Sequence, residues 1–185
     1  VEETMQALID IVKQGKALYV GISKYPPAQA KIAYEMLRAA GVPCLISQYR
    51  YSMFDRTVEE KSLPLAAEQG SGFIAFSPLA QGLLTKKYLH GIPEHSRAAR
   101  STGFLKVDQV TEDKVGKARR LDEIAARRGQ TLAEMALAWV LKDERMTSVI
   151  VGTSSVKQLA DNLHALDNLN FTNEELAEIE GILRL

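Results

Sequence analysis

A strand–helix unit that recurs along the chain constrains the fold more than any other feature. Four short apolar segments, at residues 17–23, 43–48, 72–77 and 147–152, alternate with segments of helical periodicity. A strand, a crossover helix and a second strand form a right-handed unit whose two strands are parallel. The expected strands are apolar throughout rather than alternating, so we expect both faces of the sheet to be covered. The chain is therefore predicted to be an α/β protein with a parallel sheet.

Helix limits are marked by prolines, glycines and capping residues. Apolar residues at helical spacing within residues 5–12 predict a first helix, which Gly15 closes. Pro26-Pro27 opens a second helix, which ends at Gly41. Capping boxes, in which Ser or Thr precedes Glu or Gln by three residues, predict further helix starts at Thr57–Glu60, Thr131–Glu134, Ser155–Gln158 and Thr172–Glu175.

Two architectures contain such units: an open, doubly wound sheet and a (β/α)8 TIM barrel, of which this chain would supply a part. No G-x-G-x-x-G fingerprint follows the first expected strand, which weakens the doubly wound option. In barrels the chemistry lies at the carboxyl ends of the strands. Candidate site residues stand at the ends of successive strands, at Ser23-Lys24, Gln48, Phe76-Ser77 and Gly152-Thr153. We therefore favour the barrel.

The composition is that of one ordinary globular domain, which we expect to span residues 1–185. The 23 basic and 23 acidic side chains cancel, so no net field draws the chain to nucleic acid or to an anionic membrane. No apolar run reaches membrane-spanning length, and no signal-peptide pattern is present. Cys44 is the single cysteine, which excludes an internal disulfide and suits a reducing compartment. We expect Cys44 to be buried on a strand and the protein to be cytoplasmic.

Two segments end in polar residues suited to holding a phosphate. They are residues 76–82 and 152–162, and the second continues into a helical pattern. Backbone N–H groups at a helix start point outward and carry partial positive charge. Between them lies a long basic segment, residues 82–112, that breaks the strand–helix rhythm. It is either a loop that folds over an anionic ligand or a solvated insertion, and charge alone favours the insertion.

Five motifs in this order resemble those of the aldo-keto reductases, in the branch that contains the potassium-channel β-subunits and the bacterial L-glyceraldehyde 3-phosphate reductases. The motifs lie at residues 15–23, 47–52, 76–85, 91–97 and 147–152. The resemblance implies a (β/α)8 barrel that reduces a small carbonyl substrate with NADPH. It implies homo-oligomers, as tetramers or octamers. It also implies that this chain is the C-terminal half of such a barrel, four strand–helix units followed by a C-terminal helix.

The family's catalytic residues have no matching positions in this chain. Its Asp, Tyr and Lys come from the first three strand ends and its His from the fourth, whereas this chain matches the family from the helix after the fourth strand. The histidines and nearby tyrosines lie in other places, at His90, His95, His164, Tyr25, Tyr49 and Tyr51. We therefore predict no catalytic residue here, and no metal site.

The resemblance assigns cofactor-binding roles to the strand ends. Ser23 and Gln48 match positions that hydrogen-bond the nicotinamide carboxamide, a group with both donors and an acceptor. Lys24 follows Ser23, and Phe76 matches an aromatic residue that stacks on the nicotinamide ring. The loop beneath the pyrophosphate matches Ser77, Pro78, Leu79, Ala80 and Gln81.

The same resemblance implies that residues 82–112 form a basic loop that covers the cofactor, with Lys87 and Arg97 as the basic residues that reach it. The adenosine end of the cofactor site matches Gly152, Ser154, Gln158, Asp161 and Asn162. Some relatives place Arg at Ser155, where it would grip the 2′-phosphate, so the preference for NADPH over NADH stays open. Lys157 either compensates for the missing Arg or is a solvated helix residue.

Three interpretations remain, because a complete barrel needs about 250 residues or more and this chain has 185. The first is that the chain is part of a full-length reductase. The second is a truncated nucleotide-binding module, completed by a partner half or by self-association and without reductase activity. The third is a regulatory β-subunit-like protein that senses redox state through bound NADP. The substrate is equally open among methylglyoxal, glyceraldehyde 3-phosphate and other aldehydes.

Overall fold

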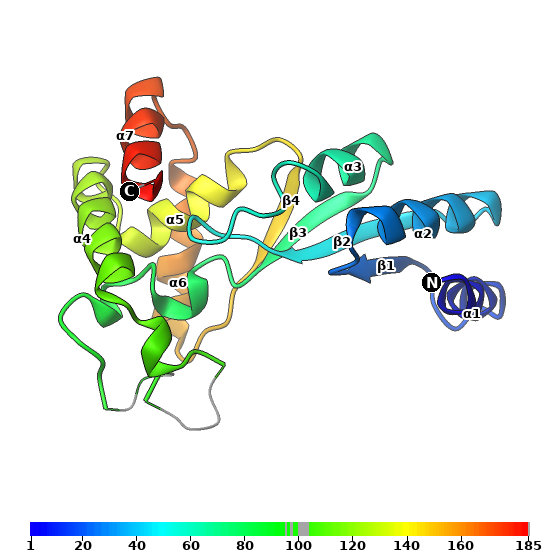
Figure 1. Ribbon diagram of the computed structural model, residues 1–185, viewed down its shortest axis with the longest axis horizontal. Coiled ribbons are helices and arrows are strands. Elements are labelled where there is room, and N and C mark those ends of the chain that lie inside the picture. The colour runs from blue at the N-terminus through cyan, green and yellow to red at the C-terminus, as the bar shows by residue number, and fades with distance from the viewer. Residues whose placement is uncertain (95, 97, 100–103, 185) are drawn as a thin grey trace.

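A parallel four-stranded sheet organises the fold (Figure 1). The computed structural model describes residues 1–94, 96, 98–99 and 104–184. The strands are β1 (Val20–Ser23), β2 (Cys44–Arg50), β3 (Gly72–Phe76) and β4 (Met146–Ile150), and they pair in the order β1-β2-β3-β4. The order of a doubly wound sheet reverses at a switch point, whereas here each strand pairs with the next along the chain. The predicted α/β class is therefore confirmed, with the arrangement expected for half of a (β/α)8 barrel.

Helices connect the strands as the sequence indicated. Helix α1 (Glu2–Lys13) precedes the sheet, α2 (Pro27–Ala39) joins β1 to β2, and α3 (Ser62–Glu68) joins β2 to β3. Gly15, with a φ of 70°, follows α1 in the left-handed conformation that glycine adopts without steric cost. The first strand begins at Val20 rather than at the predicted residue 17.

The connection from β3 to β4 is longer. It contains α4 (Glu112–Arg127) and α5 (Leu132–Leu141), and β4 is followed by α6 (Val156–Leu163) and α7 (Asn173–Arg184). Short 3-10 turns lie at Ala80–Gly82, Lys86–Tyr88, Val107–Gln109 and His164–Asp167. Within the described part of the chain, no helix has both the length and the apolar character needed to cross a membrane.

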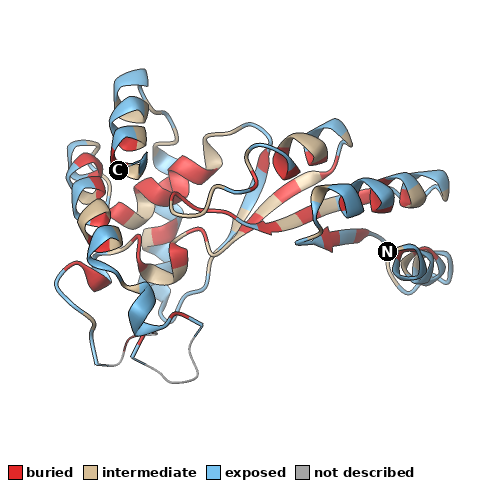
Figure 2. Ribbon diagram, viewed as in Figure 1, coloured by how far each residue is buried: buried red, intermediate tan, exposed pale blue. Residues whose placement is uncertain are grey.

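Two hydrophobic clusters hold these elements together (Figure 2). The smaller one joins α1 and α2 to β1 through side chains such as Met5, Leu37 and Ile22. The larger one joins α4, α5 and α7 to the middle of the sheet and contains Phe73 and Leu121, both fully buried. Cys44 is buried on β2, as predicted.

The two faces of the sheet differ, which corrects the expectation that both are covered. On β1, Val20 and Ile22 are buried while Gly21 and Ser23 are exposed, and burial alternates similarly along β3. Successive side chains of a strand point to opposite faces. Because right-handed crossovers between strands in sequential order all lie on one side of a sheet, the helices pack against one face. The other face carries the partly exposed side chains.

Capping residues set several helix starts as predicted. The Thr131 Oγ1 accepts a hydrogen bond from the Glu134 N–H at 3.2 Å, and a Glu134 carboxylate oxygen accepts one from the Thr131 N–H at 2.7 Å. Thr172 and Glu175 make the same pair of bonds, at 2.8 and 3.2 Å. Ser155 caps α6, because its hydroxyl accepts a hydrogen bond from the Gln158 N–H at 3.2 Å.

The predicted capping box at Thr57 and Glu60 is wrong. Helix α3 begins at Ser62, and residues 57–61 form turns. The Thr57 hydroxyl donates instead to Asp55 at 2.9 Å. Glu59 accepts hydrogen bonds from the side chains of Arg56 and Tyr51, which hold this segment away from a helical path.

Helix α4 was missed by the sequence analysis although its signals are present. Thr111 is its N-cap and accepts a hydrogen bond from the Lys114 N–H at 3.3 Å. Val115, Ala118 and Leu121 recur every three residues and are buried. These residues directly follow the long basic segment, where the alternation of strands and helices is interrupted.

Candidate functional site

The carboxyl ends of the four strands lie along one edge of the sheet, because the strands are parallel. Ser23 at the end of β1 pairs in register with Gln48 on β2. Near the end of β2, Arg50 pairs with Phe76, and Phe76 pairs with Ile150 on β4. Three of the residues assigned to the nicotinamide end, Ser23, Gln48 and Phe76, therefore lie along this edge.

A pocket of about 410 Å³ lies where the segments after β3 and β4 meet. Residues separated by about seventy positions in sequence thus line one hollow. Of the predicted site residues, the pocket brings together Ser77, Pro78, Leu79, Gln81, Lys87, Gly152, Ser154 and Gln158. The pocket also contains Thr153, a candidate from its place at a strand end, and four residues that the sequence analysis did not select, namely Gly82, Thr85, Ile150 and Val151. Thr85 belongs to a motif already recognised, and its polarity was the signal that could have added it.

Left-handed backbone conformations concentrate at these strand ends. The described non-glycine residues with positive φ are Lys24 at 59°, Ser77 at 54°, Ala80 at 47° and Gln81 at 60°. This conformation costs a non-glycine residue about 1–2 kcal/mol, because Cβ approaches the carbonyl oxygen. All four had been assigned to the site from sequence. Backbone strain of this kind clusters at ligand-binding positions, which supports a functional role for this edge.

Backbone hydrogen bonds hold the loop after β3 in this conformation. The Ala80 N–H donates to the Ser77 carbonyl at 2.9 Å, and the Gly82 N–H donates to the Leu79 carbonyl at 2.8 Å. The Leu84 N–H donates to the same Leu79 carbonyl at 3.2 Å. Ala80 is itself buried and does not line the pocket. The shape of this wall is therefore fixed largely by backbone hydrogen bonds, with one further bond from the Thr85 hydroxyl to the Gly82 carbonyl at 2.7 Å.

The opposite wall is the start of α6. The Gln158 Oε1 accepts hydrogen bonds from the Ser154 N–H at 2.9 Å and from the Ser154 hydroxyl at 3.1 Å. Gln158 and Ser154 are thus joined to each other across the first turn of the helix. The positive end of the α6 dipole lies at this wall.

Two predicted residues farther along α6 lie outside the pocket lining. Asp161 forms an ion pair with Lys157 at 2.8 Å, and the Lys157 side chain is largely exposed. The Lys157 ammonium is thus paired with a carboxylate on the same helix. Asn162 is buried, and its side-chain Nδ2 has no hydrogen-bond partner among the described residues. A buried amide donor without a partner is costly, so Asn162 retains a donor that a ligand could use.

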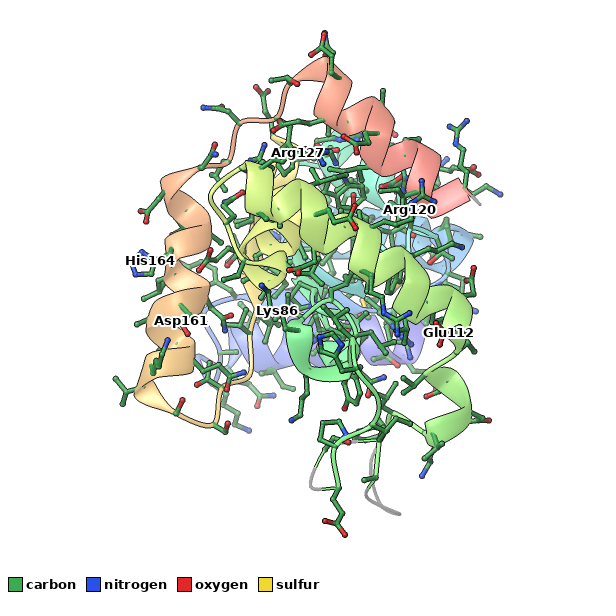
Figure 3. All side chains as sticks on the ribbon, turned by 90° about the vertical axis from the view of Figure 1, so that its left-hand side faces the viewer. Lys86, Glu112, Arg120, Arg127, Asp161 and His164 are labelled. Carbon is green, nitrogen blue, oxygen red and sulfur yellow. The ribbon has the colours of Figure 1, made fainter. Side chains whose placement is uncertain are left out.

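Two adjacent lysines at the start of the long segment differ in their surroundings. Lys87 lines the pocket and is exposed. The Lys86 ammonium instead lies 3.5 Å from the Asp122 carboxylate on α4. Figure 3 shows Lys86 beside α4 and Asp161 on α6. Of the two lysines, Lys87 is therefore the one placed to meet an anion in the pocket.

The long basic segment is anchored in the protein core along part of its length, which argues against a wholly solvated insertion. Leu84, Tyr88 and Leu89 are buried in the larger hydrophobic cluster. The Arg119 guanidinium on α4 donates to the Leu89 carbonyl at 3.0 Å. Arg97, to which the sequence analysis assigned a phosphate contact, lies outside the described residues.

Among the described histidines and tyrosines named in the sequence analysis, none lines the pocket, and His95 lies outside the described residues. His164 points away from the body of the molecule (Figure 3). Its hydrogen bond to Asp167, at 2.9 Å, and the Asp167 charge raise the pKa of His164. The Tyr51 hydroxyl donates to Glu59, and burial raises its pKa. These contacts give His164 and Tyr51 structural partners away from the strand ends.

Comparison with known proteins decides the family. The family model described as "Aldo/keto reductase family" matches residues 1–184. The chain belongs to the aldo/keto reductase family. It is 48% identical over 183 residues to an L-glyceraldehyde 3-phosphate reductase of Escherichia coli O157:H7, and 46% identical over 183 residues to one of Escherichia coli strain K12. Each match covers 97% of this chain and 53% of the relative, so this aldo/keto reductase chain spans about half the length of these relatives. The resemblance inferred from the five motifs is confirmed.

Proposed function

We propose that this chain forms the cofactor-binding half of an NADPH-dependent reductase that converts aldehydes or ketones to alcohols. The observation that carries the proposal is the convergence of the loop after β3 and the start of α6 on one pocket, beside a strand edge that bears Ser23 and Gln48. Similarity to L-glyceraldehyde 3-phosphate reductase supports the reaction class. Glyceraldehyde 3-phosphate and methylglyoxal are the substrates we propose to test first.

The residues of the pocket fit the anionic part of a dinucleotide. Lys87 supplies a positive charge in one wall, and the positive end of the α6 dipole lies at the other, where Gln158 accepts both Ser154 hydrogen bonds. Helix starts and exposed backbone N–H groups suit phosphate. The unpartnered Nδ2 of Asn162 fits a polar ligand on the α6 side.

The strand edge fits the nicotinamide end. Gln48 offers both an amide donor and an acceptor, and Ser23 offers a hydroxyl, which together match a carboxamide. Phe76 is partly exposed at the same edge, where an aromatic face suits ring stacking. These side chains would orient a nicotinamide so that one ring face meets the substrate.

A bound nicotinamide supplies the hydride that reduces the carbonyl carbon. The chain's own contribution is to bind and orient the cofactor. Tyr49, near this edge, is a poor proton donor, since its hydroxyl donates to a backbone carbonyl and burial raises its pKa to about 12. We therefore expect the proton to come from the family's Tyr, which has no matching position in this chain.

Cofactor binding tests the proposal directly. Titration of the 185-residue chain with NADPH and with NADH, followed by nicotinamide fluorescence, is expected to give saturable binding that favours NADPH. Replacing Lys87 by Ala should weaken NADPH binding by about 1–3 kcal/mol, the range for a charge-assisted contact. Lys86→Ala is the matched control, because Lys86 pairs with Asp122 outside the pocket, and it should leave the affinity unchanged.

Three outcomes would count against the proposal. Absence of NADPH binding would contradict the cofactor site, and equal losses in the two lysine variants would contradict the role of the pocket. Tight NADPH binding without aldehyde reduction by a full-length protein carrying this chain would favour a redox-sensing β-subunit-like role.

We also expect Arg97→Ala to weaken NADPH binding by about 1–3 kcal/mol if Arg97 contacts a phosphate.

A further inference from the structure

The turn after β1 is fastened to β2 by two hydrogen bonds. The Lys24 N–H donates to the Gln48 carbonyl at 3.0 Å, which extends the sheet by one residue beyond β1. The Tyr49 hydroxyl donates to the Tyr25 carbonyl at 2.7 Å. Between these two bonds lies Lys24, with a φ of 59°. The chain therefore leaves the sheet after Ser23 at the strained residue Lys24, and hydrogen bonds hold the backbone at Lys24 and at Tyr25.

The Tyr49 side chain lies on the face of the sheet that packs against the helices. Neighbouring residues of a strand point to opposite faces, so Tyr49 faces the helices while Gln48 faces the partly exposed side. Tyr49 is 6% exposed, and its ring stacks on Phe73 with 5.1 Å between centroids and 8° between planes. The ring is thus fixed, with its hydroxyl directed at the Tyr25 carbonyl. A cofactor on the opposite face would not touch Tyr49.

The hydroxyl remains a donor over a wide pH range. Burial raises the pKa of Tyr49 to about 12, so its proton is retained near neutral pH. A buried tyrosine hydroxyl usually finds a partner, and here the hydroxyl donates to a backbone carbonyl in the turn. The position of that carbonyl is therefore tied to the rigid Tyr49–Phe73 stack.

We propose that Tyr49 is a positioning residue that fixes the turn after β1, and with it Ser23, for the nicotinamide end of the cofactor. This inference rests on the proposed function for the identity of the ligand. Loss of the Tyr49 hydroxyl would free the Tyr25 carbonyl and let the left-handed Lys24 relax. Ser23 would then lose its alignment beside Gln48. The pocket between β3 and α6 would be unaffected, since it shares no residue with this turn.

The matched pair of variants is Tyr49→Phe and Tyr34→Phe. Tyr34 is equally buried, at 3% exposure, and its hydroxyl forms a 2.6 Å hydrogen bond with the Ser47 hydroxyl. Both substitutions remove one buried tyrosine hydroxyl and keep the ring. Only Tyr49→Phe breaks a bond to the turn after β1. A general loss of packing or stability would affect both variants, whereas positioning would affect one.

Two ligands separate the ends of the cofactor site. NADPH engages the whole site, whereas adenosine 2′,5′-bisphosphate lacks the nicotinamide and would engage the adenosine end alone. Tyr49→Phe is expected to weaken NADPH binding about three- to tenfold, the factor for loss of one hydrogen bond. It should leave the bisphosphate affinity unchanged, and Tyr34→Phe should leave both affinities unchanged.

Amide hydrogen exchange gives a readout that needs no ligand. Because the Lys24 N–H is bonded to Gln48, its exchange reports opening of the turn. We expect this amide to exchange about three- to tenfold faster in Tyr49→Phe and at the unchanged rate in Tyr34→Phe.

The outcomes are distinguishable. The positioning role would be overturned if Tyr49→Phe left the NADPH affinity unchanged, or if it lowered the affinities for NADPH and for the bisphosphate equally. If the unsubstituted chain binds neither ligand, the proposed function fails, and the exchange of Lys24 then decides whether Tyr49 holds the turn. Unchanged exchange in Tyr49→Phe would overturn the inference whatever the ligand.

Discussion

Replacing Gly21 by Ala should destabilise the protein and disturb the strand end that bears Ser23. Gly21 lies on β1 at a register irregularity and pairs with Ile46 on β2. A Cβ at Gly21 would lie 2.7 Å from the Ile46 Cγ2 and 2.7 Å from the Ile46 carbonyl oxygen. Both distances are far inside van der Waals contact. The side chain of Ile46 could rotate away, but its carbonyl oxygen can move only if β2 shifts.

The expected cost follows from this backbone contact. Inserting a methyl group into a closely packed site costs about 1–3 kcal/mol, because neighbouring groups must move. That is a large share of a total stability of about 5–15 kcal/mol. The forced separation of β1 from β2 would also widen the gap between Ser23 and Gln48. We therefore expect weaker NADPH binding in addition to lower stability.

Urea-induced unfolding measures the stability term. The single tryptophan, Trp139, is 2% exposed in the larger core cluster, so its fluorescence reports unfolding. Gly116→Ala on α4 is the matched control, because a Cβ there would meet no atom within 4 Å. It should stabilise by about 0.5–1 kcal/mol through the higher helix propensity of Ala. An unfolding free energy for Gly21→Ala within about 0.5 kcal/mol of the unsubstituted chain would refute the steric argument.

Two further predictions concern a helix cap and a buried tyrosine. Thr131→Ala should lower the free energy of unfolding by about 1 kcal/mol, because the α5 cap is lost. Thr57 caps no helix, so Thr57→Ala should change the free energy measured by urea unfolding by less than about 0.5 kcal/mol. Equal effects of the two substitutions would contradict the assignment of the cap. Burial raises the pKa of Tyr49 from 10.0 to about 12, so the protonated hydroxyl is favoured in the folded state. Its stabilising contribution is full below pH 10 and is lost as the pH rises through about 12. Urea midpoints measured across this interval should fall less steeply in Tyr49→Phe, and parallel curves would exclude this titration.

Local sequence signals predicted helix starts well where the stabilising interaction joins residues that are close together in the sequence. Thr131 and Thr172 cap their helices through residues three positions away, so the pattern contains the whole interaction. The same reasoning failed at Thr57, because Arg56, Tyr51 and Glu59 form a competing network of side-chain hydrogen bonds. The sheet was predicted to be covered on both faces because apolar strands suggested it, yet the sequential strand order places the helices on one face.

The candidate site shows the same division. Its residues at the strand ends were selected from sequence, since parallel strands bring their carboxyl ends to one edge and the family motifs mark them. The part of the pocket wall formed by Thr85 and Val151 was not selected, because lining depends on how two distant loops face each other. The cofactor-binding roles assigned to all of the selected residues, Asp161, Asn162 and Arg97 among them, stay predictions.

Sequence alone determined the α/β class, most of the helix starts and the family, because hydrophobic periodicity, caps and motifs are properties of neighbouring residues. Only the tertiary structure decided the close approach of Gly21 to Ile46, the left-handed residues at the strand ends and the bond from Tyr49 to Tyr25. Each of these depends on strand register or on contacts between residues far apart in sequence. Register and packing are set by the whole fold, and no local pattern specifies them.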